Sequence, residues 1–166
     1  NNDGGRFAID ANTGIVTVAG AIDREADGPI RHFTVRATSA DGSFTDQVFT
    51  IAINDVDEFD VGAVSDSDAA PNTVPENAVN GTTVGIIITA TDADATTNSI
   101  TFTLDDNAGG RFAIHASTGV VTVADGSLLN REAAASHNIT VRATSADGSF
   151  SSQTFTIVVI DVDEFD

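Results

Sequence analysis

An internal repeat constrains the fold of this chain more strongly than any other feature of its sequence. The hexapeptide DVDEFD occupies residues 55–60 and 161–166, and the octapeptide ATSADGSF occupies residues 37–44 and 143–150. Both pairs lie 106 positions apart (161 − 55 and 143 − 37). A period of this length is the usual size of a domain, so the chain carries copies of one module.

The local sequence pattern is that of strands separated by turns. Segments rich in β-branched and aromatic residues alternate with turn-forming pairs such as Thr118-Gly119 and Asp147-Gly148. No segment keeps helical periodicity over three turns. Seven strands are predicted in the second copy, at residues 72–76, 83–91, 100–104, 112–114, 120–123, 139–143 and 154–160. The chain is therefore expected to be all-β, with each complete module a seven-strand antiparallel Greek-key β-sandwich.

The core of that sandwich is predicted from the apolar positions of the strands. The residues expected to point inward are Ile86, Ile88, Phe102, Phe112, Val121, Val141, Phe155 and Ile157. These side chains are assigned to packing and to no functional role.

The repeat divides the chain unequally. Residues 61–166 span the whole period, whereas residues 1–60 match only its back part. We expect residues 61–166 to form a complete repeat and residues 1–60 to be the C-terminal half of another. Half a sandwich exposes an apolar face and a strand edge, so its front half must come from a longer chain or from another molecule. Strand exchange between two molecules, which would give a dimer, is the main alternative.

The charge of the chain excludes some partners. There are 25 acidic residues against 7 Lys and Arg, for a net charge of −18. Such a polyanion is repelled by nucleic acid, which we exclude as a partner, and by anionic membrane surfaces. There is no Cys, so disulfides and Cys-ligated zinc are also excluded. The acidic residues gather at residues 55–60, 66–68, 92–94, 105–106 and 161–166.

Two of these gatherings are expected to meet at one end of the second sandwich. Asp92 and Asp94 follow the predicted strand 83–91, and a Greek key can bring the loop that holds Asp147 to the same end. Asp55 and Asp57 lie where the first copy ends. Like charges packed this closely repel one another by about several kcal/mol, and Ca²⁺, which binds six to eight oxygens, would neutralise them.

Four motifs in this order resemble the cadherin-type repeat. Pro75-Glu76-Asn77 matches the PEN motif of that family, and Asp92-Ala93-Asp94 matches its DxD motif. Ile22-Asp23-Arg24-Glu25 matches its LDRE motif, and residues 55–59 stand at the place of its DxNDN linker. The lack of Cys and the bias toward Gly, Thr, Ala and Asp make the chain most similar to the cadherin-like tandem repeats of large bacterial surface or secreted adhesins.

The resemblance implies Ca²⁺ ions at the junction between the two copies. The implied side-chain ligands there are Asp23, Glu25, Asp55, Asp57, Glu58, Asp92, Asp94 and Asp147, and the implied backbone carbonyls are those of Phe59 and Asn98. The first copy lacks a PEN glutamate, so this junction is either weakened or completed by another chain. Asp57 also stands where the family has Asn.

The resemblance implies a second, half-formed site at the end of the second copy. Its ligands would be Glu76, Asn130, Glu132, Asp161, Asp163 and Glu164. Asn130 replaces the Asp of the family's LDRE motif and removes one carboxylate. We expect this half-site to be empty or loosely occupied without a following repeat.

The function implied by the resemblance is that of a calcium-rigidified repeat of an extracellular, cell-surface or secreted adhesin, which is not an enzyme. Its partners would be neighbouring repeats and, for adhesion, a like molecule or a polysaccharide. A carbohydrate-binding module of a secreted polysaccharide-active protein stays open, although the lack of Trp and Tyr counts against it. So does a passive spacer. Each motif taken singly also fits a turn or a surface ion pair of Arg24 or Arg131.

Overall fold

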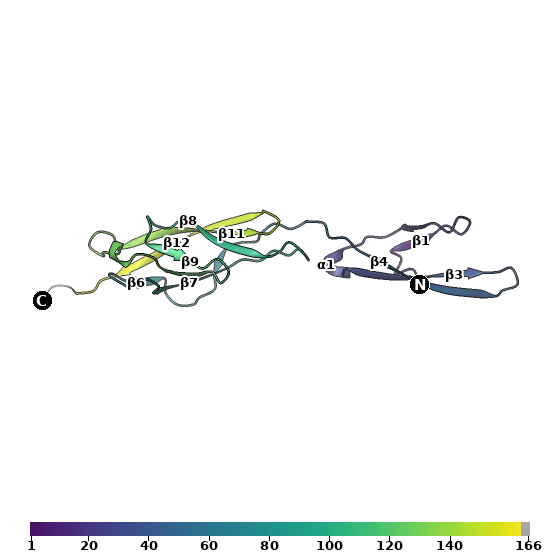
Figure 1. The fold of residues 1–166 in the computed structure, drawn as a ribbon, viewed down its shortest axis with the longest axis horizontal. Coiled ribbons are helices and arrows are strands. Elements are labelled where there is room, and N and C mark those ends of the chain that lie inside the picture. The colour runs from purple at the N-terminus through teal and green to yellow at the C-terminus, as the bar shows by residue number, and fades with distance from the viewer. Residues whose placement is uncertain (164–166) are drawn as a thin grey trace. The chain divides into compact units, whose positions relative to one another are not determined.

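The chain forms two compact units in the computed structural model, which describes residues 1–163 (Figure 1). The first unit is Asn1–Val56 and the second is Asp57–Asp166. Strands dominate both units. Among the described residues, no helix is both long and apolar enough to cross a membrane.

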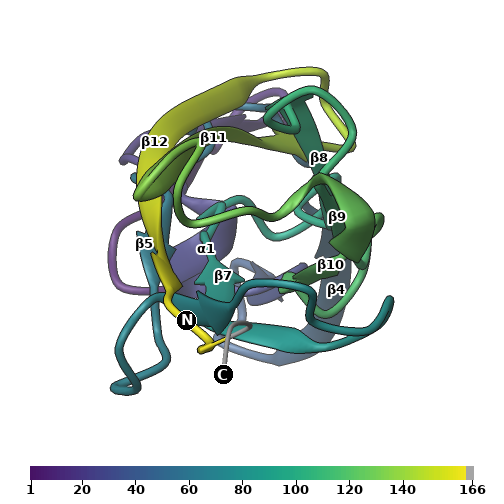
Figure 2. The ribbon, with the colours of Figure 1, turned by 90° about the vertical axis from the view of Figure 1, so that its left-hand side faces the viewer.

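The second unit is a β-sandwich. Its strands are β5 (Ser65–Asp66), β6 (Thr73–Pro75), β7 (Thr83–Thr89), β8 (Ile100–Asp106), β9 (Phe112–Ile114), β10 (Val120–Val123), β11 (Ser136–Ser145) and β12 (Phe150–Ile160), with a 3-10 turn, η1, at Gly126–Leu128. One sheet has the order β5-β7-β10-β9 and the other β6-β12-β11-β8, and the two sheets face each other in Figure 2. The predicted sandwich is therefore confirmed.

The structure adds one strand to the seven predicted. Ser65–Asp66 forms a short edge strand paired with β7, whereas β6 joins the opposite sheet and runs parallel to β12. All other strand pairs are antiparallel. β5 consists of two polar residues, which show no hydrophobic periodicity, so the sequence pattern does not predict this strand. The Asp66 carboxylate helps to hold β5 against β7, because it accepts the backbone N–H of Ile87 at 3.0 Å.

A single apolar core lies between the two sheets of the second unit. Of the residues predicted to point inward, all are buried except Phe155, which is half-buried and packs against the core. The core also contains Leu129, which is fully buried although it lies in a loop outside the predicted strands. The alternation of residues along strands explains the burial of the predicted inward residues, whereas the burial of Leu129 depends on how its loop folds back onto the core.

The first unit consists of two hairpins and one helical turn. Its elements are β1 (Phe7–Ile9), β2 (Val16–Val18), α1 (Arg24–Asp27), β3 (Ile30–Thr38) and β4 (Phe44–Ala52). Within residues 1–163, β1 pairs only with β2, and β3 only with β4. The sequence pattern did not predict α1. It begins at Asp23, whose carboxylate accepts the backbone N–H of Ala26 at 2.8 Å, and it ends at Gly28.

Candidate metal sites

Three carboxylates converge where the chain enters the second unit. Asp57 lies in the entering segment, Asp94 follows β7, and Asp147 lies in the turn between β11 and β12. One carboxylate oxygen from each lies within 4.8 Å of the others. Two oxygens bound to one Ca²⁺ at about 2.4 Å can be at most about 4.8 Å apart. The group therefore has dimensions that suit a single ion of this kind.

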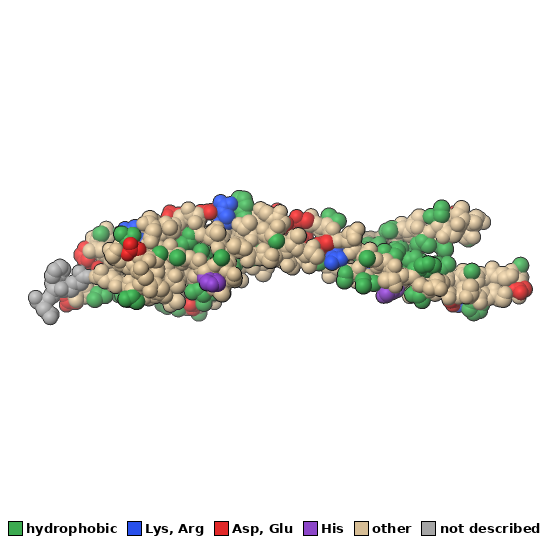
Figure 3. Space-filling model, in the orientation of Figure 1, with side chains coloured by type: hydrophobic (Ala, Val, Ile, Leu, Met, Phe, Trp, Pro, Cys, Tyr) green, Lys and Arg blue, Asp and Glu red, His purple; other side chains and the backbone are tan. Residues whose placement is uncertain are grey.

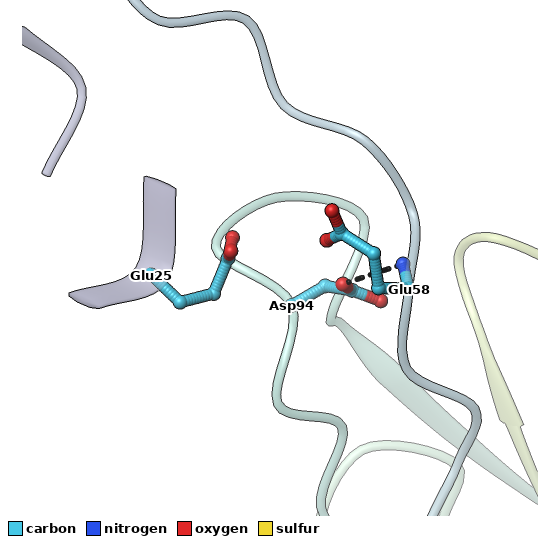
Figure 4. A group of neighbouring side chains, drawn as sticks. All are labelled: Glu25, Glu58 and Asp94. Carbon is cyan, nitrogen blue, oxygen red and sulfur yellow. Dashed lines mark hydrogen bonds between the residues drawn. The ribbon is translucent and has the colours of Figure 1, made fainter. Parts of the chain in front are cut away.

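Asp94 is the buried member of this group. Its side chain is only 2% exposed, and its two oxygens accept the backbone N–H groups of Glu58 at 3.2 Å and Phe59 at 3.3 Å. Figure 4 shows the first of these bonds. The Asn98 side-chain amide donates to the Asp94 carbonyl at 2.7 Å and holds the loop. Neutral N–H donors offset only part of the cost of burying a carboxylate, so a cation nearby is favoured.

Asp92 contributes a further carboxylate, only one oxygen of which accepts a hydrogen bond from the described residues. Its Oδ1 accepts the backbone N–H of Asp94 at 3.1 Å, while its buried Oδ2 has no hydrogen-bond donor among residues 1–163. The Ser145 hydroxyl lies close enough to lower the pKa of Asp92, as does the Asp94 N–H. The single proton of that hydroxyl, however, is directed at the carbonyl of Thr97 at 2.8 Å. Asp92 Oδ2 is thus free to bind a cation.

The pKa of Asp57 reflects the repulsion among the carboxylates of this group. Its pKa is raised chiefly by the side-chain interaction with the Asp94 carboxylate, and further by desolvation and by the negative charge of Asp147. Asp147 itself accepts both the N–H and the hydroxyl of Ser149. Every candidate ligand atom here is oxygen, the donor that Ca²⁺ prefers. The residues present therefore fit a calcium ion.

A second group of acids lies at the opposite end of this unit. Oxygens of Glu76, Glu132 and Asp161 lie within 4.8 Å of one another. Glu76 is 2% exposed and accepts two backbone N–H groups at 2.8 Å, from Arg131 and from Val162. These bonds lower the pKa of Glu76. The Glu132 backbone N–H favours its own charged carboxylate, but desolvation and the charge of Glu76 outweigh it and raise the pKa of Glu132.

The remaining residues predicted for this second group contribute less. The Asn130 side chain accepts the backbone N–H of Ala133 at 2.6 Å and is committed to that turn. Asp163 follows Asp161 by two residues but is not a member of the group of three acids. Glu164 lies outside the described residues.

The predicted ligands of the first unit have local roles. Asp23 is the N-cap of α1, Glu25 is an exposed residue of the same turn, and Asp55 lies 3.2 Å from the Arg24 guanidinium. Arg24 therefore pairs with Asp55. Within the first unit, all of which the structure describes, these three acids do not form a group of their own.

Two serines near the first acidic group were not predicted. Ser145 lies beside Asp92, and the Ser149 hydroxyl accepts the backbone N–H of Val61 at 3.0 Å, which ties the entering segment to the β11–β12 turn. Phe59, predicted to offer its carbonyl, is bound through its N–H to Asp94. The signal for both serines was present in the sequence, because they belong to the repeated octapeptide ATSADGSF.

Comparison with known proteins finds cadherins. The profile of the cadherin domain matches residues 70–163. Human protocadherin Fat 4 is 36% identical over 145 residues, which cover 86% of this chain and 3% of that protein. Human protocadherin Fat 1 is 34% identical over 165 residues, covering 98% of this chain and 4% of that protein. The crystal structure of mouse cadherin-23 EC22-24 aligns with a TM-score of 0.77 and 27% identity, over 95% of this chain and 51% of that one.

These relatives are much longer than the chain. The chain spans about 3–4% of the length of the two Fat protocadherins. Cadherins and protocadherins are extracellular adhesion proteins and not enzymes, and cadherin domains bind Ca²⁺. The relatives named here are animal proteins, so the more specific likeness to bacterial adhesin repeats gains no support from them.

Proposed function

Because this chain belongs to the cadherin family, we propose that it is a calcium-binding, calcium-rigidified repeat of an extracellular adhesin. The observation that carries the proposal is the acidic group at the start of the second unit. It combines a buried carboxylate, Asp94, with a buried carboxylate oxygen of Asp92 that lacks a donor. Asp57 and Asp147 complete the group. A bound cation resolves the repulsion and supplies the missing partner.

The role of the ion would be mechanical. Bound Ca²⁺ would hold the entering segment against the β7 loop and the β11–β12 turn, so that the approach to the sandwich becomes stiff. Glu58, Phe59 and Asn98 are proposed as further ligands at this end. The first copy would contribute Asp23, Glu25 and Asp55, as the family resemblance implies. Extracellular modules bind Ca²⁺ with dissociation constants of about 10⁻⁴–10⁻³ M, so the stiffening would depend on the calcium level outside the cell.

The second acidic group is proposed as half of a further calcium site. Glu76, Glu132 and Asp161 present oxygens on the scale of one ion, and Asp163, Glu164 and Asn130 are proposed to join them when a repeat follows. Glu76 and Asp94 each accept two N–H groups, but the first group lies beside the buried Asp92 oxygen that lacks a donor, so the first group needs the ion more than the second does. We therefore expect weaker binding here.

The wider function follows as part of the same proposal. The protein to which this chain belongs would act at the cell surface or outside the cell, with neighbouring repeats as its immediate partners. Adhesion would be to a like molecule or to a polysaccharide. Residues 1–60 are proposed to be the back half of one repeat and residues 61–166 a complete one. A source among bacterial adhesins stays a prediction.

Calorimetry tests the proposal. Chelator-treated protein titrated with Ca²⁺ should release or absorb heat with a dissociation constant of about 10⁻⁴–10⁻³ M, and its melting temperature should rise by about a few degrees at millimolar Ca²⁺. Asp94→Asn should weaken the tighter site by about tenfold or more. Asp105→Asn, an acid outside both groups, serves as the matched control and should leave the titration unchanged. Absence of binding heat and of stabilisation at 10 mM Ca²⁺, about ten times the weaker constant, would overturn the proposal.

A further inference from the structure

Six pairs of residues in this chain place Gly directly after Asp or Asn. They are Asp3-Gly4, Asp27-Gly28, Asp41-Gly42, Asn80-Gly81, Asp125-Gly126 and Asp147-Gly148. Gly has no Cβ, so its backbone nitrogen can approach the side-chain carbonyl carbon of the residue before it. Pairs of this kind can therefore rearrange without an enzyme.

The rearrangement of an Asp-Gly pair has two steps. The Gly nitrogen attacks the Asp Cγ, and a C–N bond closes a succinimide ring while the C–OH bond breaks. The hydroxyl leaves with the amide proton as water. A water molecule then opens the ring at either carbonyl and gives Asp again or isoaspartate. No oxidant or reductant takes part, and the product has the same atoms as the starting chain.

The structure restrains four of the six pairs. The carboxylates of Asp3 and Asp27 are ion-paired with arginine side chains. The Asn80 side-chain oxygen accepts the N–H of Gly126 at 2.9 Å, and this bond fixes the side chain of one pair and the nitrogen of another. In each of these pairs, one of the two atoms that must meet is held by a neighbour.

The other two pairs lie in the two copies of the octapeptide ATSADGSF. Asp41-Gly42 forms the turn between β3 and β4, and Asp147-Gly148 forms the turn between β11 and β12. Asp41 accepts the N–H and the hydroxyl of Ser43, and Asp147 accepts the same two groups of Ser149. The two glycines have φ of +86° and +100°, and a Cβ on either would meet nothing within 4 Å. The two turns therefore match in sequence and in local bonds.

The surroundings of the two turns differ. The Asp41 turn is exposed at the tip of the β3–β4 hairpin, where Figure 3 shows acidic side chains at the surface. Asp147 is half-buried, and one of its oxygens lies within 4.8 Å of oxygens of Asp57 and Asp94. Asp41 belongs to none of the acidic groups found within residues 1–163. One turn is thus part of a candidate metal site and its twin is not.

Ring closure at Asp147 requires two movements. The Gly148 N–H must leave the Ser145 carbonyl, to which it donates at 3.1 Å, and the Asp147 Cγ must turn toward the freed nitrogen. An ion bound to the Asp147 carboxylate would hold that carbon beside the other acids and keep the turn closed. The Gly42 N–H donates to the Ser39 carbonyl at 3.0 Å in the same way, but no acidic group fixes that turn.

We propose that Asp147-Gly148 is a site of spontaneous isomerisation to isoaspartate, which bound Ca²⁺ suppresses and which destroys the calcium site once it has occurred. This inference rests on the proposed calcium binding. In isoaspartate the main chain runs through the former side chain, so the turn gains a backbone carbon and the carboxylate is one carbon shorter. It would no longer reach the place beside Asp57 and Asp94. The β11–β12 turn would thus keep a lasting record of time spent without calcium.

The twin turns provide an internal comparison for the test. The chain is incubated at neutral pH in heavy-oxygen water, with chelator or with about 10 mM Ca²⁺, and isoaspartate at each turn is measured by mass spectrometry. Thr45 follows one octapeptide and Ser151 the other, so the two copies are distinguished. Isoaspartate should form at both turns in chelator. Ca²⁺ should slow its formation at Asp147 by about tenfold or more and leave Asp41 unchanged, because the closed state gains by about the ratio of ligand concentration to dissociation constant.

Two variants and a binding measurement control the comparison. Asp94→Asn weakens the site, so the same Ca²⁺ concentration should protect Asp147 much less, whereas Asp105→Asn should keep the full protection. Chain aged in chelator is then titrated with Ca²⁺ by calorimetry. The fraction of chains that has lost the site of Asp57, Asp94 and Asp147 should equal the fraction with isoaspartate at position 147.

Calorimetry on fresh chain separates this inference from the proposed function. Calcium binding without protection of Asp147, or no isoaspartate at Asp147 in chelator, would overturn the inference and leave the calcium site standing. Equal protection of Asp41 and Asp147 would reveal a general effect of Ca²⁺ on the reaction and would also overturn it. So would aged chain that keeps the whole site in spite of isoaspartate at position 147. Absence of calcium binding would overturn both proposals.

Discussion

The two units carry nearly the same residues at equivalent places and yet bury them differently. Val141 and Ile157 are fully buried, while Val35 and Ile51, which stand 106 positions earlier, are half-buried. Phe155 and Phe49 differ in the same direction. Burial is thus decided less by the residue itself than by whether a facing sheet is present, so a repeat read from sequence does not by itself guarantee a core.

A matched pair of core truncations offers the largest expected contrast between the units. Ile157→Ala should reduce the free energy of unfolding by about 3 kcal/mol, because it leaves a cavity in a closed core. Ile51→Ala should cost about 1 kcal/mol or less, because the side chain is already in contact with water. Denaturant unfolding read by exchange in each unit measures both. Equal losses would contradict the contrast.

Substitution of the equivalent turn glycines, Gly119 and Gly14, should give the next largest difference in stability between the two units. Gly119→Ala should cost about 2–3 kcal/mol, because a positive φ is strained for Ala and because the new Cβ would collide with the Ile88 carbonyl. Gly14→Ala should cost only about 1 kcal/mol, the strain of φ alone. Chemical denaturation of both variants provides the measurement. A larger loss at Gly14 would mean that a neighbour occupies the space beside β2.

Asp57 of the first acidic group and Glu76 of the second should contribute to the pH dependence of stability with opposite signs. The raised pKa of Asp57 means that the folded state binds this proton more tightly than the unfolded chain does, so stability falls as pH rises through that pKa. The lowered pKa of Glu76 stabilises the fold above the unfolded value of about 4.3 and is lost only as pH falls below it. In chelator, the melting temperature should therefore rise as the pH is lowered from 7 through the raised pKa of Asp57, and the contribution of Glu76 should be lost only below a pH of about 4.3.

Calcium and two substitutions test the contrast between Asp57 and Glu76. Millimolar Ca²⁺ should abolish the rise, because the ion replaces the proton as the neutralising charge. Asp57→Asn should flatten the profile in chelator, whereas Glu76→Gln should leave its slope between pH 7 and pH 5 unchanged. A melting temperature that falls on acidification to pH 5 in chelator would show that repulsion in the first group does not govern stability.

The smallest expected effects concern the two surface arginines. Arg142 pairs with Asp105 across two strands, and Arg36 pairs with Asp46 within one hairpin. Both arginines also lie over a phenylalanine ring, at 4.0 Å and 3.9 Å from the centroid. Asp105→Asn and Asp46→Asn should each lower the melting temperature by no more than about two degrees, because exposed pairs contribute little. A loss of five degrees or more by thermal melting would contradict this ranking.

The sandwich could be predicted because its residues alternate along strands and its turns carry Gly, which are local signals. The inward positions of Ile86, Val121 and Val141 followed directly from the strand pattern, whereas the order of the strands in each sheet comes from the structure. β5 and Leu129 did not follow from that pattern, because their places depend on contacts distant in the sequence. The brief helix α1 was missed for a related reason, since a single turn held by its cap leaves no periodic trace.

Part of the candidate site was also within reach of the sequence. The convergence of Asp94 and Asp147 followed from the expected topology, and Asp57 followed from its place in the family's linker motif. The partners of each carboxylate could not be predicted. That Asp94 accepts two N–H groups from the entering segment, and that Arg24 pairs with Asp55, depends on side-chain directions that no motif encodes.

The parallel pairing of β6 with β12 has a consequence for a chain under tension. In the sequence β6 is one of the first strands of the second unit and β12 is its last, and the two run parallel, so a pull on the two ends of the chain loads this pair along its length. Its hydrogen bonds must then be sheared together, whereas an antiparallel hairpin pulled from its open end unzips one bond at a time. The Glu76 carboxylate accepts the backbone N–H of Val162, just beyond the end of β12, and so adds one more bond that must break before the two strands separate. The module is thus arranged to bear force along its axis.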